Sequence, residues 1–234
     1  MQVDGVEKPL TRLIHTGSVI VDLVLEVPHL PHRGGDVLAS SSQFVVGGGL
    51  NVLTAAQRDG LEAVFAGRRG TGAFGAMIDR ALSDQGIVTA LPPIADLDSG
   101  YSVVLVDPTT ERTFVTYPGA EQLLSSQDLA AVLVRDDDIV YATGYSLSST
   151  DRGKPVAGWL AALPEGPVVV FDPGPLVGGL DADLLRMVMS RVDVLSCNAR
   201  EATISTGFND PAEAALALLA GLRPGSAVLV REGP

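Results

Sequence analysis

The sequence contains a single cysteine, Cys197, among 234 residues. This excludes an intrachain disulfide and a metal cluster built on cysteines. Long apolar runs are also missing, because the longest, such as residues 167–171, fit a strand and not a membrane span. The first eleven residues carry Asp4, Glu7 and Lys8 and lack the apolar segment of a signal peptide. We therefore expect a cytoplasmic protein that does not enter a membrane.

Positive charge is scarce. The 16 Lys and Arg residues face 28 Asp and Glu residues, which gives a formal net charge of −12 with histidine neutral. Such a chain is poorly suited to nucleic acid or an anionic membrane surface, although backbone N–H groups can still hold a phosphate. Hydrophobic residues make up 46% and charged residues 19%, which excludes a disordered chain.

Apolar segments alternate with amphipathic helical segments, a pattern typical of an α/β domain with a largely parallel sheet. Strands of this sheet are expected at residues 13–16, 63–66, 139–143, 168–172, 192–196 and 227–230. Helices are expected at residues 51–59, 76–85 and 210–220. The last of these has readable start signals, because Asp210 precedes Pro211 and Glu213 follows in the first turn.

Two pairs of strand-like segments have no helix between them and predict a small four-stranded sheet. Its strands are expected at residues 18–27, 36–46, 101–107 and 112–117, the last two forming a hairpin. This sheet would be an insertion, residues 18–46 and 99–117, in an α/β core formed by residues 1–17, 47–98 and 118–234. Its apolar face must be covered by the core or by a partner.

The turn from Gly47 through Gly48, Gly49 and Leu50 to Asn51 stands between an extended segment and a helix. Glycines let the backbone approach a ligand closely, and the helix N-terminus behind them offers free N–H groups. The turn matches neither the G-x-G-x-x-G pattern nor a Walker A loop, since no G-K-[ST] follows. A purely structural turn is the alternative.

Asp22 interrupts the apolar alternation of residues 18–27. A carboxylate there must be hydrogen-bonded or solvated, and its two oxygens suit two neighbouring hydroxyls of a sugar. The alternative is a half-exposed acid on an edge strand.

Asn198 and Glu201 follow the expected strand at residues 192–196. The carboxyl ends of parallel strands line a ligand crevice, so this amide and carboxylate could hold a hydrated Mg²⁺ and its phosphates. A capping box is the alternative, and both roles are compatible. Neighbouring Cys197 is expected to be a packing residue.

Taken in order, these segments resemble the ribokinase/PfkB family of carbohydrate and nucleoside kinases along nearly the whole chain. The resemblance rests on Gly17, Ser18 and Asp22, the turn at 47–51, the segment 67–75, Arg112, Gly119-Ala120, Gly144, Asp172-Pro173, and Asn198 with Glu201. Two positions differ: Val46 stands where many members have another glycine, and Gly72 stands where the family segment G-x-x-G-x-D-x-F-G has aspartate.

The resemblance implies a ribokinase-like α/β fold, a central mostly parallel sheet flanked by helices, with the small inserted sheet as a lid. It also implies phosphoryl transfer from ATP, with Mg²⁺, to a hydroxymethyl group of a sugar or related polyol. The substrate-binding residues would be Asp22, Gly47, Gly48, Gly49 and Asn51. Those organising ATP phosphates would be Asn198 and Glu201, with Glu201 as the metal residue. A homodimer through the lid is expected as well.

The family's second signature, D-T-x-G-A-G-D, is missing from the sequence. In the family this stretch supplies the general base and N–H groups around the transferring phosphate. We expect it beyond Pro234, so the core would be incomplete at its C-terminus and no catalytic residue is assigned. A non-catalytic protein of the same fold that binds a small polyol or oligomerises is the alternative. A dinucleotide-dependent oxidoreductase fits less well, because the glycine turn follows the inserted sheet.

The remaining unusual residues are expected to be structural. His15 lies in an apolar strand and is expected to be a core histidine with satisfied hydrogen bonds. His29 and His32 flank a turn and are too isolated for a metal site. Residues 136–138, three aspartates, are expected to form a solvated turn, and Trp159 to lie in the core.

Overall fold

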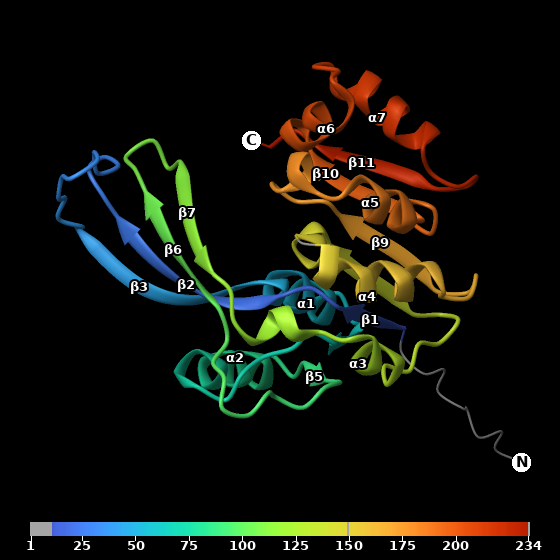
Figure 1. The fold of residues 1–234 in the computed structure, drawn as a ribbon, viewed down its shortest axis with the longest axis horizontal. Coiled ribbons are helices and arrows are strands. Elements are labelled where there is room, and N and C mark those ends of the chain that lie inside the picture. The colour runs from blue at the N-terminus through green and yellow to red at the C-terminus, as the bar shows by residue number, and fades with distance from the viewer. Residues whose placement is uncertain (1–10, 149, 234) are drawn as a thin grey trace, which may run out of the picture.

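The computed structural model describes residues 11–148 and 150–233, and it contains two separate sheets (Figure 1). The larger sheet has seven strands, all parallel to their neighbours, in the order β11-β10-β9-β8-β1-β4-β5. Its strands are β1 (Arg12–His15), β4 (Glu62–Phe65), β5 (Val88–Thr89), β8 (Ile139–Thr143), β9 (Val168–Asp172), β10 (Val194–Asn198) and β11 (Ala227–Arg231). The predicted α/β fold with a parallel central sheet is confirmed. Residues 1–10, where we expected no signal peptide, lie outside the described residues.

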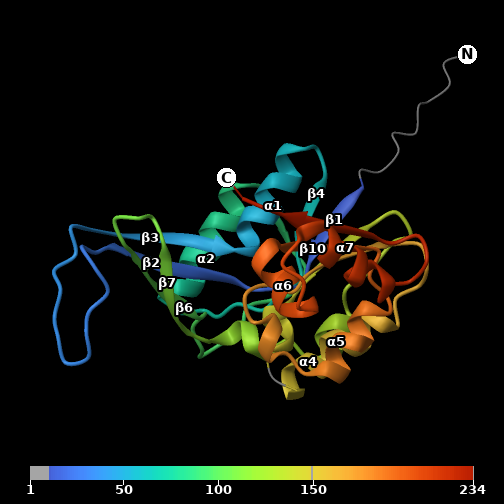
Figure 2. The same cartoon turned by 90° about the horizontal axis from the view of Figure 1, so that it is seen from above.

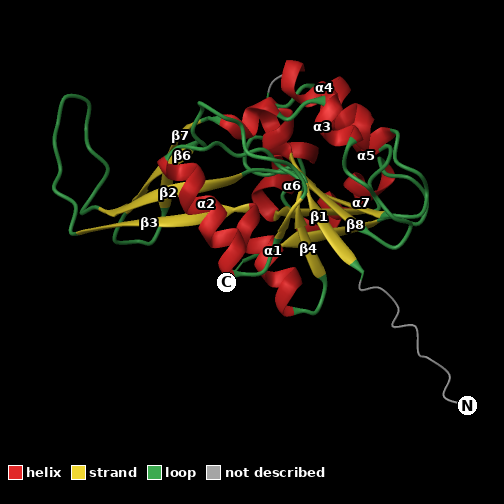
Figure 3. Cartoon of the chain, turned by 90° about the horizontal axis from the view of Figure 1, so that it is seen from below, coloured by secondary structure: helices red, strands yellow, loops and turns green. Residues whose placement is uncertain are grey.

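Helices cover the larger sheet on both faces (Figure 3). They are α1 (Gly49–Arg58), α2 (Ala73–Asp84), α3 (Ser126–Ala130), α4 (Thr150–Ala161), α5 (Ala182–Met189), α6 (Ala199–Thr206) and α7 (Pro211–Ala220), with short 3₁₀ turns η1 (Ala120–Leu123), η2 (Gly144–Leu147) and η3 (Val177–Gly179). Alternation along β1 explains the two layers: Leu13 packs with buried residues of α1 and α2, whereas Ile14 packs with those of α3, α4 and α5. Trp159 packs at the edge of this second cluster, as expected.

The smaller sheet has four strands in the order β3-β2-β6-β7 and projects from the larger sheet, with α2 packed against its base (Figure 2). Its strands are β2 (Val19–Glu26), β3 (Ser41–Gly48), β6 (Tyr101–Val106) and β7 (Arg112–Tyr117). β2 runs parallel to β6, and the two outer pairs are antiparallel. The predicted small sheet and its hairpin are therefore confirmed.

Three sequence-based expectations need correction. The strand expected from residue 36 begins only at Ser41, because its partner β2 ends at Glu26 and offers no further backbone groups. The strand expected at 192–196 lies two residues later, as β10. Asp138 does not lie in a solvated turn: it is 1% exposed and its carboxylate accepts two hydrogen bonds from the Arg12 guanidinium, at 2.9 and 2.5 Å.

Within the described part of the chain, no helix combines the length and apolar character that crossing a membrane requires.

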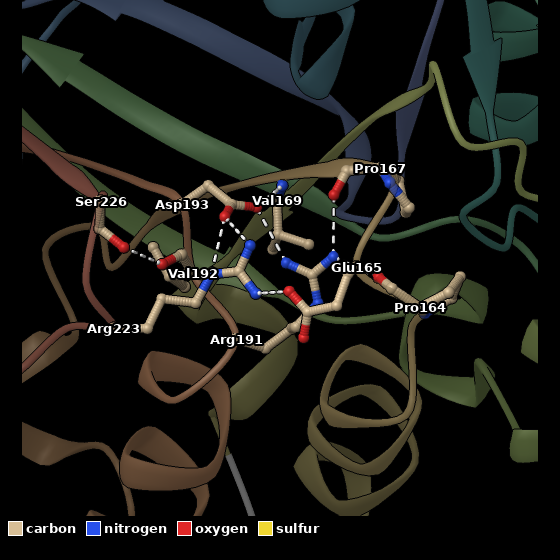
Figure 4. A network of polar contacts seen from close by, with 9 residues as sticks. All are labelled: Pro164, Glu165, Pro167, Val169, Arg191, Val192, Asp193, Arg223 and Ser226. Carbon is tan, nitrogen blue, oxygen red and sulfur yellow. Dashed lines mark hydrogen bonds and ion pairs between the residues drawn. The ribbon is translucent and has the colours of Figure 1, made fainter.

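A network of charged groups ties the loops together at the end of the larger sheet where β9 and β10 begin (Figure 4). The Asp193 carboxylate accepts hydrogen bonds from the Val169 N–H at 2.7 Å and from the Arg191 guanidinium at 2.9 Å. It also accepts hydrogen bonds from the Arg223 guanidinium. Arg191 further donates to the carbonyl oxygen of Pro167 at 2.8 Å. Burial alone would raise the pKa of Asp193, but these donors outweigh burial and lower it. The carboxylate is therefore ionised at neutral pH, and its stabilising contribution is lost only in acid.

We expect Asp193→Ala to lower the free energy of unfolding by about 2–4 kcal/mol at pH 7, because Arg191 and Arg223 each lose one of their partners, a carboxylate in a partly buried site. Urea unfolding followed by circular dichroism measures this. Asp183→Ala is the matched control, since Asp183 pairs with Arg186 on the exposed surface and its loss should leave the midpoint nearly unchanged. Equal effects of the two substitutions would show that the network does not hold the strands.

Candidate functional site

Polar residues gather at one edge of the larger sheet. Because all seven strands are parallel, their carboxyl ends lie at this same edge, where open α/β sheets bind ligands. The last residues of β1, β8, β9, β10 and β11 are polar or charged: His15, Thr143, Asp172, Asn198 and Arg231.

The glycine-rich turn lies at this edge, between the end of β3 and the start of α1. Gly48 has a φ of 63°, which favours glycine, and the Gly49 N–H donates to the Ser18 carbonyl oxygen at 2.8 Å. No side chain caps α1 and no acidic residue lies in its first turn. The N–H groups of the first turn that follow Gly49 are thus available to a polar or anionic ligand.

Asp22 lies directly beside this turn. A Cβ on Gly47 would be 2.6 Å from Asp22 Oδ2, so the contact requires glycine at position 47. The carboxylate is half-buried, and burial raises the pKa of Asp22 while Arg112 on β7 opposes the rise. No described residue donates a hydrogen bond to the Asp22 side chain. An unpaired, partly desolvated carboxylate next to a bare helix N-terminus is a strong acceptor for hydroxyl groups.

Asn51 is less clearly part of this arrangement. It is exposed in the first turn of α1 and lines a groove between α1 and α2, together with Thr54 and Arg58. The structure thus brings Asp22 to the glycines of the turn, whereas Asn51 has no contact with Asp22 among the hydrogen bonds of the described residues.

Asn198 and Glu201 form the capping box that was the alternative interpretation. The Asn198 side chain accepts the Glu201 N–H at 2.8 Å, and Glu201 Oε2 accepts the Asn198 N–H at 2.8 Å. Glu201 is 4% exposed; burial raises its pKa, and the nearby Asp172 carboxylate adds to the rise against the opposing Asn198 N–H. Cys197 packs against Ala202 and Ala214, as expected, and burial raises its pKa to about 11.

A row of hydrogen bonds joins the ends of β8, β9 and β11. Asp172 Oδ2 accepts from Tyr141 Oη at 3.4 Å and from Arg231 at 3.1 Å, and Arg231 also donates to Ser196. Burial, followed by the charge of Asp172, raises the pKa of Tyr141 to about 12. Tyr141 and Arg231 were missed by sequence reasoning, although Tyr141 lies within the expected strand 139–143 and Arg231 directly follows the expected strand 227–230.

Tyr145 is a further residue that the sequence did not single out. It lies in η2, just after β8, and is 48% exposed. Its pKa is raised by burial and then by the charges of Glu201, Asp22 and Asp172. Asp22 lies on β2 of the small sheet, Asp172 on β9 of the larger sheet and Glu201 on α6, so charges from three separate elements act on Tyr145.

The missing aspartate at position 72 is replaced from another part of the chain. Asp98 accepts the N–H groups of Phe74 and Gly75, in the first turn of α2, at 3.1 and 2.8 Å. A Cβ on Gly72 would lie 2.3 Å from Asp98 Cγ, so the Asp98 carboxyl occupies the space of a side chain at position 72. Asp98 therefore caps α2 in place of an N-cap side chain.

A family model described as pfkB family carbohydrate kinase matches residues 10–234. The chain belongs to the PfkB family of carbohydrate kinases. Among its relatives, the uncharacterized sugar kinase YegV of Escherichia coli K12 is 32% identical over 191 residues, which cover 81% of this chain and 58% of YegV. Ribokinase of Arabidopsis thaliana is 27% identical over 205 residues, covering 84% of this chain and 52% of the relative. The chain thus spans little more than half the length of these curated PfkB relatives.

Solved structures of PfkB kinases share the fold. The Arabidopsis thaliana ribokinase complexed with ribose and ATP has a TM-score of 0.66 at 23% identity, covering 94% of this chain and 72% of that chain. The adenosine kinase of Sinorhizobium meliloti has a TM-score of 0.77 at 18% identity, covering 95% of this chain and 75% of that chain. The predicted ribokinase-like fold is confirmed.

Magnesium is the metal expected for a PfkB kinase. No group of three or more His, Cys, Asp or Glu side chains suited to a metal occurs among residues 11–148 and 150–233. Glu201 Oε1 accepts no hydrogen bond from a described residue, whereas both oxygens of Asp172 have donors. This donor set fits a hydrated Mg²⁺ held through water and phosphates, and not a closed cage of protein ligands.

We expect Asp98→Ala to lower the free energy of unfolding by about 1–2 kcal/mol, because the N–H groups at the start of α2 lose their acceptor. Adding Gly72→Asp restores a carboxylate in the vacated space and should recover most of the loss. Gly72→Asp alone should destabilise the protein, since its Cβ would lie 2.3 Å from Asp98 Cγ. Thermal unfolding of the three variants measures this. If the double variant were no more stable than Asp98→Ala, Asp98 would not be acting in place of a side chain at position 72.

Proposed function

We propose that the chain forms the acceptor-binding and phosphate-binding part of a cytoplasmic, ATP-dependent kinase that phosphorylates a hydroxymethyl group of a sugar or related polyol. The observation that carries this proposal is the unpaired, half-buried Asp22 beside the bare N-terminus of α1. Membership of the PfkB family supports it, as does the likeness to a ribokinase complexed with ribose and ATP.

The acceptor would bind between Asp22 and the glycine-rich turn. Two neighbouring hydroxyls would donate to the two Asp22 oxygens, and the glycines would let the sugar approach the backbone N–H groups of α1. Asn51, in the first turn of the helix, would add an amide. A neutral polyol fits here, because a second anion would repel the Asp22 carboxylate.

The phosphates of ATP would lie toward Asn198 and Glu201. When bound, Mg²⁺ neutralises negative charge that builds on the phosphates during transfer. Glu201 Oε1 would accept a hydrogen bond from a metal-bound water, while Glu201 Oε2 keeps the capping contact to Asn198. The capping box thus fixes the direction of the carboxylate.

In the transfer itself, the acceptor oxygen would bond to the γ-phosphorus as the bond from phosphorus to the bridging oxygen of ADP breaks. The hydroxyl proton must pass to a base. Asp22 is assigned to holding hydroxyls, and we propose that the base comes from a G-A-G-D stretch outside these 234 residues. Reading the coding sequence after Pro234 tests this part directly, and phosphate transfer by the intact gene product to D-ribose, D-fructose, myo-inositol and adenosine tests the activity.

The small sheet would act as the lid over the acceptor and as a dimer surface. All six residues of β7 are exposed, including Phe114, Val115 and Tyr117. Exposed apolar side chains on an edge strand need a cover, which a second copy of the lid would supply.

We expect Asp22→Ala to weaken acceptor binding by about 10- to 100-fold, because two hydroxyls lose a charged partner. Calorimetric titration with the best sugar of the panel measures the affinity. Glu26→Ala is the matched control, since Glu26 lies on the same strand but is exposed. Equal affinities for the two variants would remove Asp22 from the acceptor site.

We expect Glu201→Gln to raise the Mg²⁺ concentration needed for half-maximal phosphate transfer by about tenfold, because a neutral amide holds the hydrated ion less strongly. Glutamine also serves at the third position of a capping box, so the melting temperature should change little. A Mg²⁺ titration identical to that of the wild type would leave Glu201 with the capping role alone.

A further inference from the structure

His15 fills the space beneath the glycine-rich turn. It is the last residue of β1 and is 1% exposed. Its ring stacks on Tyr141 of β8, with centroids 5.2 Å apart and an interplanar angle of 14°. A Cβ on Gly17 would lie 2.7 Å from His15 Cε1, and one on Gly49 would lie 2.4 Å from the same atom. The ring is thus wedged between β8 and the backbone of both glycine positions.

The hydrogen bonding of the ring fixes its protonation state. His15 Nδ1 accepts the Gly17 N–H at 3.0 Å, so this nitrogen carries no proton and the neutral ring is protonated at Nε2. Burial lowers the pKa of His15 to about 4, which keeps the ring neutral at physiological pH. Nε2 has no partner among the described residues, so the expectation of a fully satisfied core histidine is wrong. The titratable group stacked against the ring is Tyr141, which is neutral at the same pH.

The His15 ring lies against Gly17 and Gly49, and a backbone hydrogen bond connects the two segments that contain these glycines. The Gly49 N–H donates to the Ser18 carbonyl oxygen at 2.8 Å, which links the segment after β1 to the start of α1. Gly47, in the same turn, lies against the Asp22 carboxylate. A shift of the His15 ring would therefore move Gly17 and Gly49 together and change the spacing between the turn and Asp22.

We propose that His15 is a positioning residue for the acceptor site: its neutral ring, held by the Gly17 N–H and by Tyr141, sets the position of the glycine-rich turn relative to Asp22. His15 does not touch the acceptor, and its effect passes through Gly17 and Gly49. This inference rests on the proposed acceptor site, so its test needs one measurement on kinetics and one that does not involve activity.

The kinetic test compares His15→Leu, which has a similar size but no acceptor atom, with His15→Asn, which places an amide oxygen near the position of Nδ1. We expect His15→Leu to raise the KM for the best sugar of the panel by about tenfold, while kcat and the KM for ATP stay within about twofold. His15→Asn should recover most of the sugar KM. His32→Leu, in the exposed loop between β2 and β3, is the control and should change neither. An unchanged sugar KM in His15→Leu, or equal rises in both KM values, would overturn the proposal.

The second test is nuclear magnetic resonance of the free protein. His15 should remain neutral and protonated at Nε2 between about pH 8 and 5.5, because burial lowers its pKa to about 4. The amide resonances of Gly47 and Gly49 should move in His15→Leu and stay near their wild-type positions in His15→Asn.

The two tests fail in different ways. If the resonances behave as expected but the wild type phosphorylates no member of the panel, the proposed kinase function is wrong and the positioning of the turn by His15 stands. If His15 takes up a proton between about pH 8 and 5.5, or if the Gly47 and Gly49 resonances do not respond to His15→Leu, the positioning role is wrong whatever the activity.

Discussion

Close backbone packing around the end of β1 is the constraint on which the rest of the molecule depends. Three glycines there have no room for a side chain: a Cβ would lie 2.7 Å from His15 Cε1 at Gly17, 2.4 Å from the same atom at Gly49, and 2.5 Å from the Gly17 carbonyl oxygen at Gly67. The chain passes from the large sheet into the small one at Gly17 and returns at Gly49. Because packed interiors resist deformation, these contacts fix where the small sheet begins relative to the large one.

The parallel strands place the polar residues at one edge of the larger sheet. The hydrogen-bond partners of each carboxylate then determine what that carboxylate can bind. Asp172 is balanced by Arg231, whereas Asp22 has no hydrogen-bond donor among the described residues. An unpaired carboxylate can accept hydrogen bonds from neutral hydroxyl groups, while Arg231 near the buried Glu201 and Asp172 places charges of both signs at the other end. The proposed separation of an acceptor end at Asp22 from a phosphate end at Glu201 is thus supported by charge pairing as well as by position.

Most of the fold could be predicted from the sequence, because strand and helix periods are local signals: every strand except the two-residue β5, and the helix that starts at Pro211, lie near their expected positions. The capping box at Asn198 and the location of Asp22 were also within reach. Contacts between segments that are far apart in the sequence could not be predicted. Asp98 replaces a side chain at position 72 from 26 residues away, and Asp138 is buried by Arg12 across a separation of 126 residues. A single sequence carries no signal for such pairs. For the same reason it does not show that Tyr145 lies near carboxylates from distant segments.

The chain also enters the small sheet at Gly100 and leaves it at Gly119, and hydrogen bonds hold this second crossing as close contacts hold the first one at Gly17 and Gly49. Glu121 accepts the N–H groups of Gly100, just before β6, and Gly119, just after β7, at 2.9 and 2.7 Å. One carboxylate thus joins the two strands where they leave the larger sheet, as the His15 ring does at Gly17 and Gly49. With both crossings held, rotation of the small sheet as a rigid unit about them is restricted. The proposed closure of this sheet over an acceptor would therefore have to come from bending and twisting of β2, β3, β6 and β7 beyond the crossings. Because Asp22 lies on β2 near the base of that sheet, the proposed acceptor site would keep its geometry while the distal strands moved.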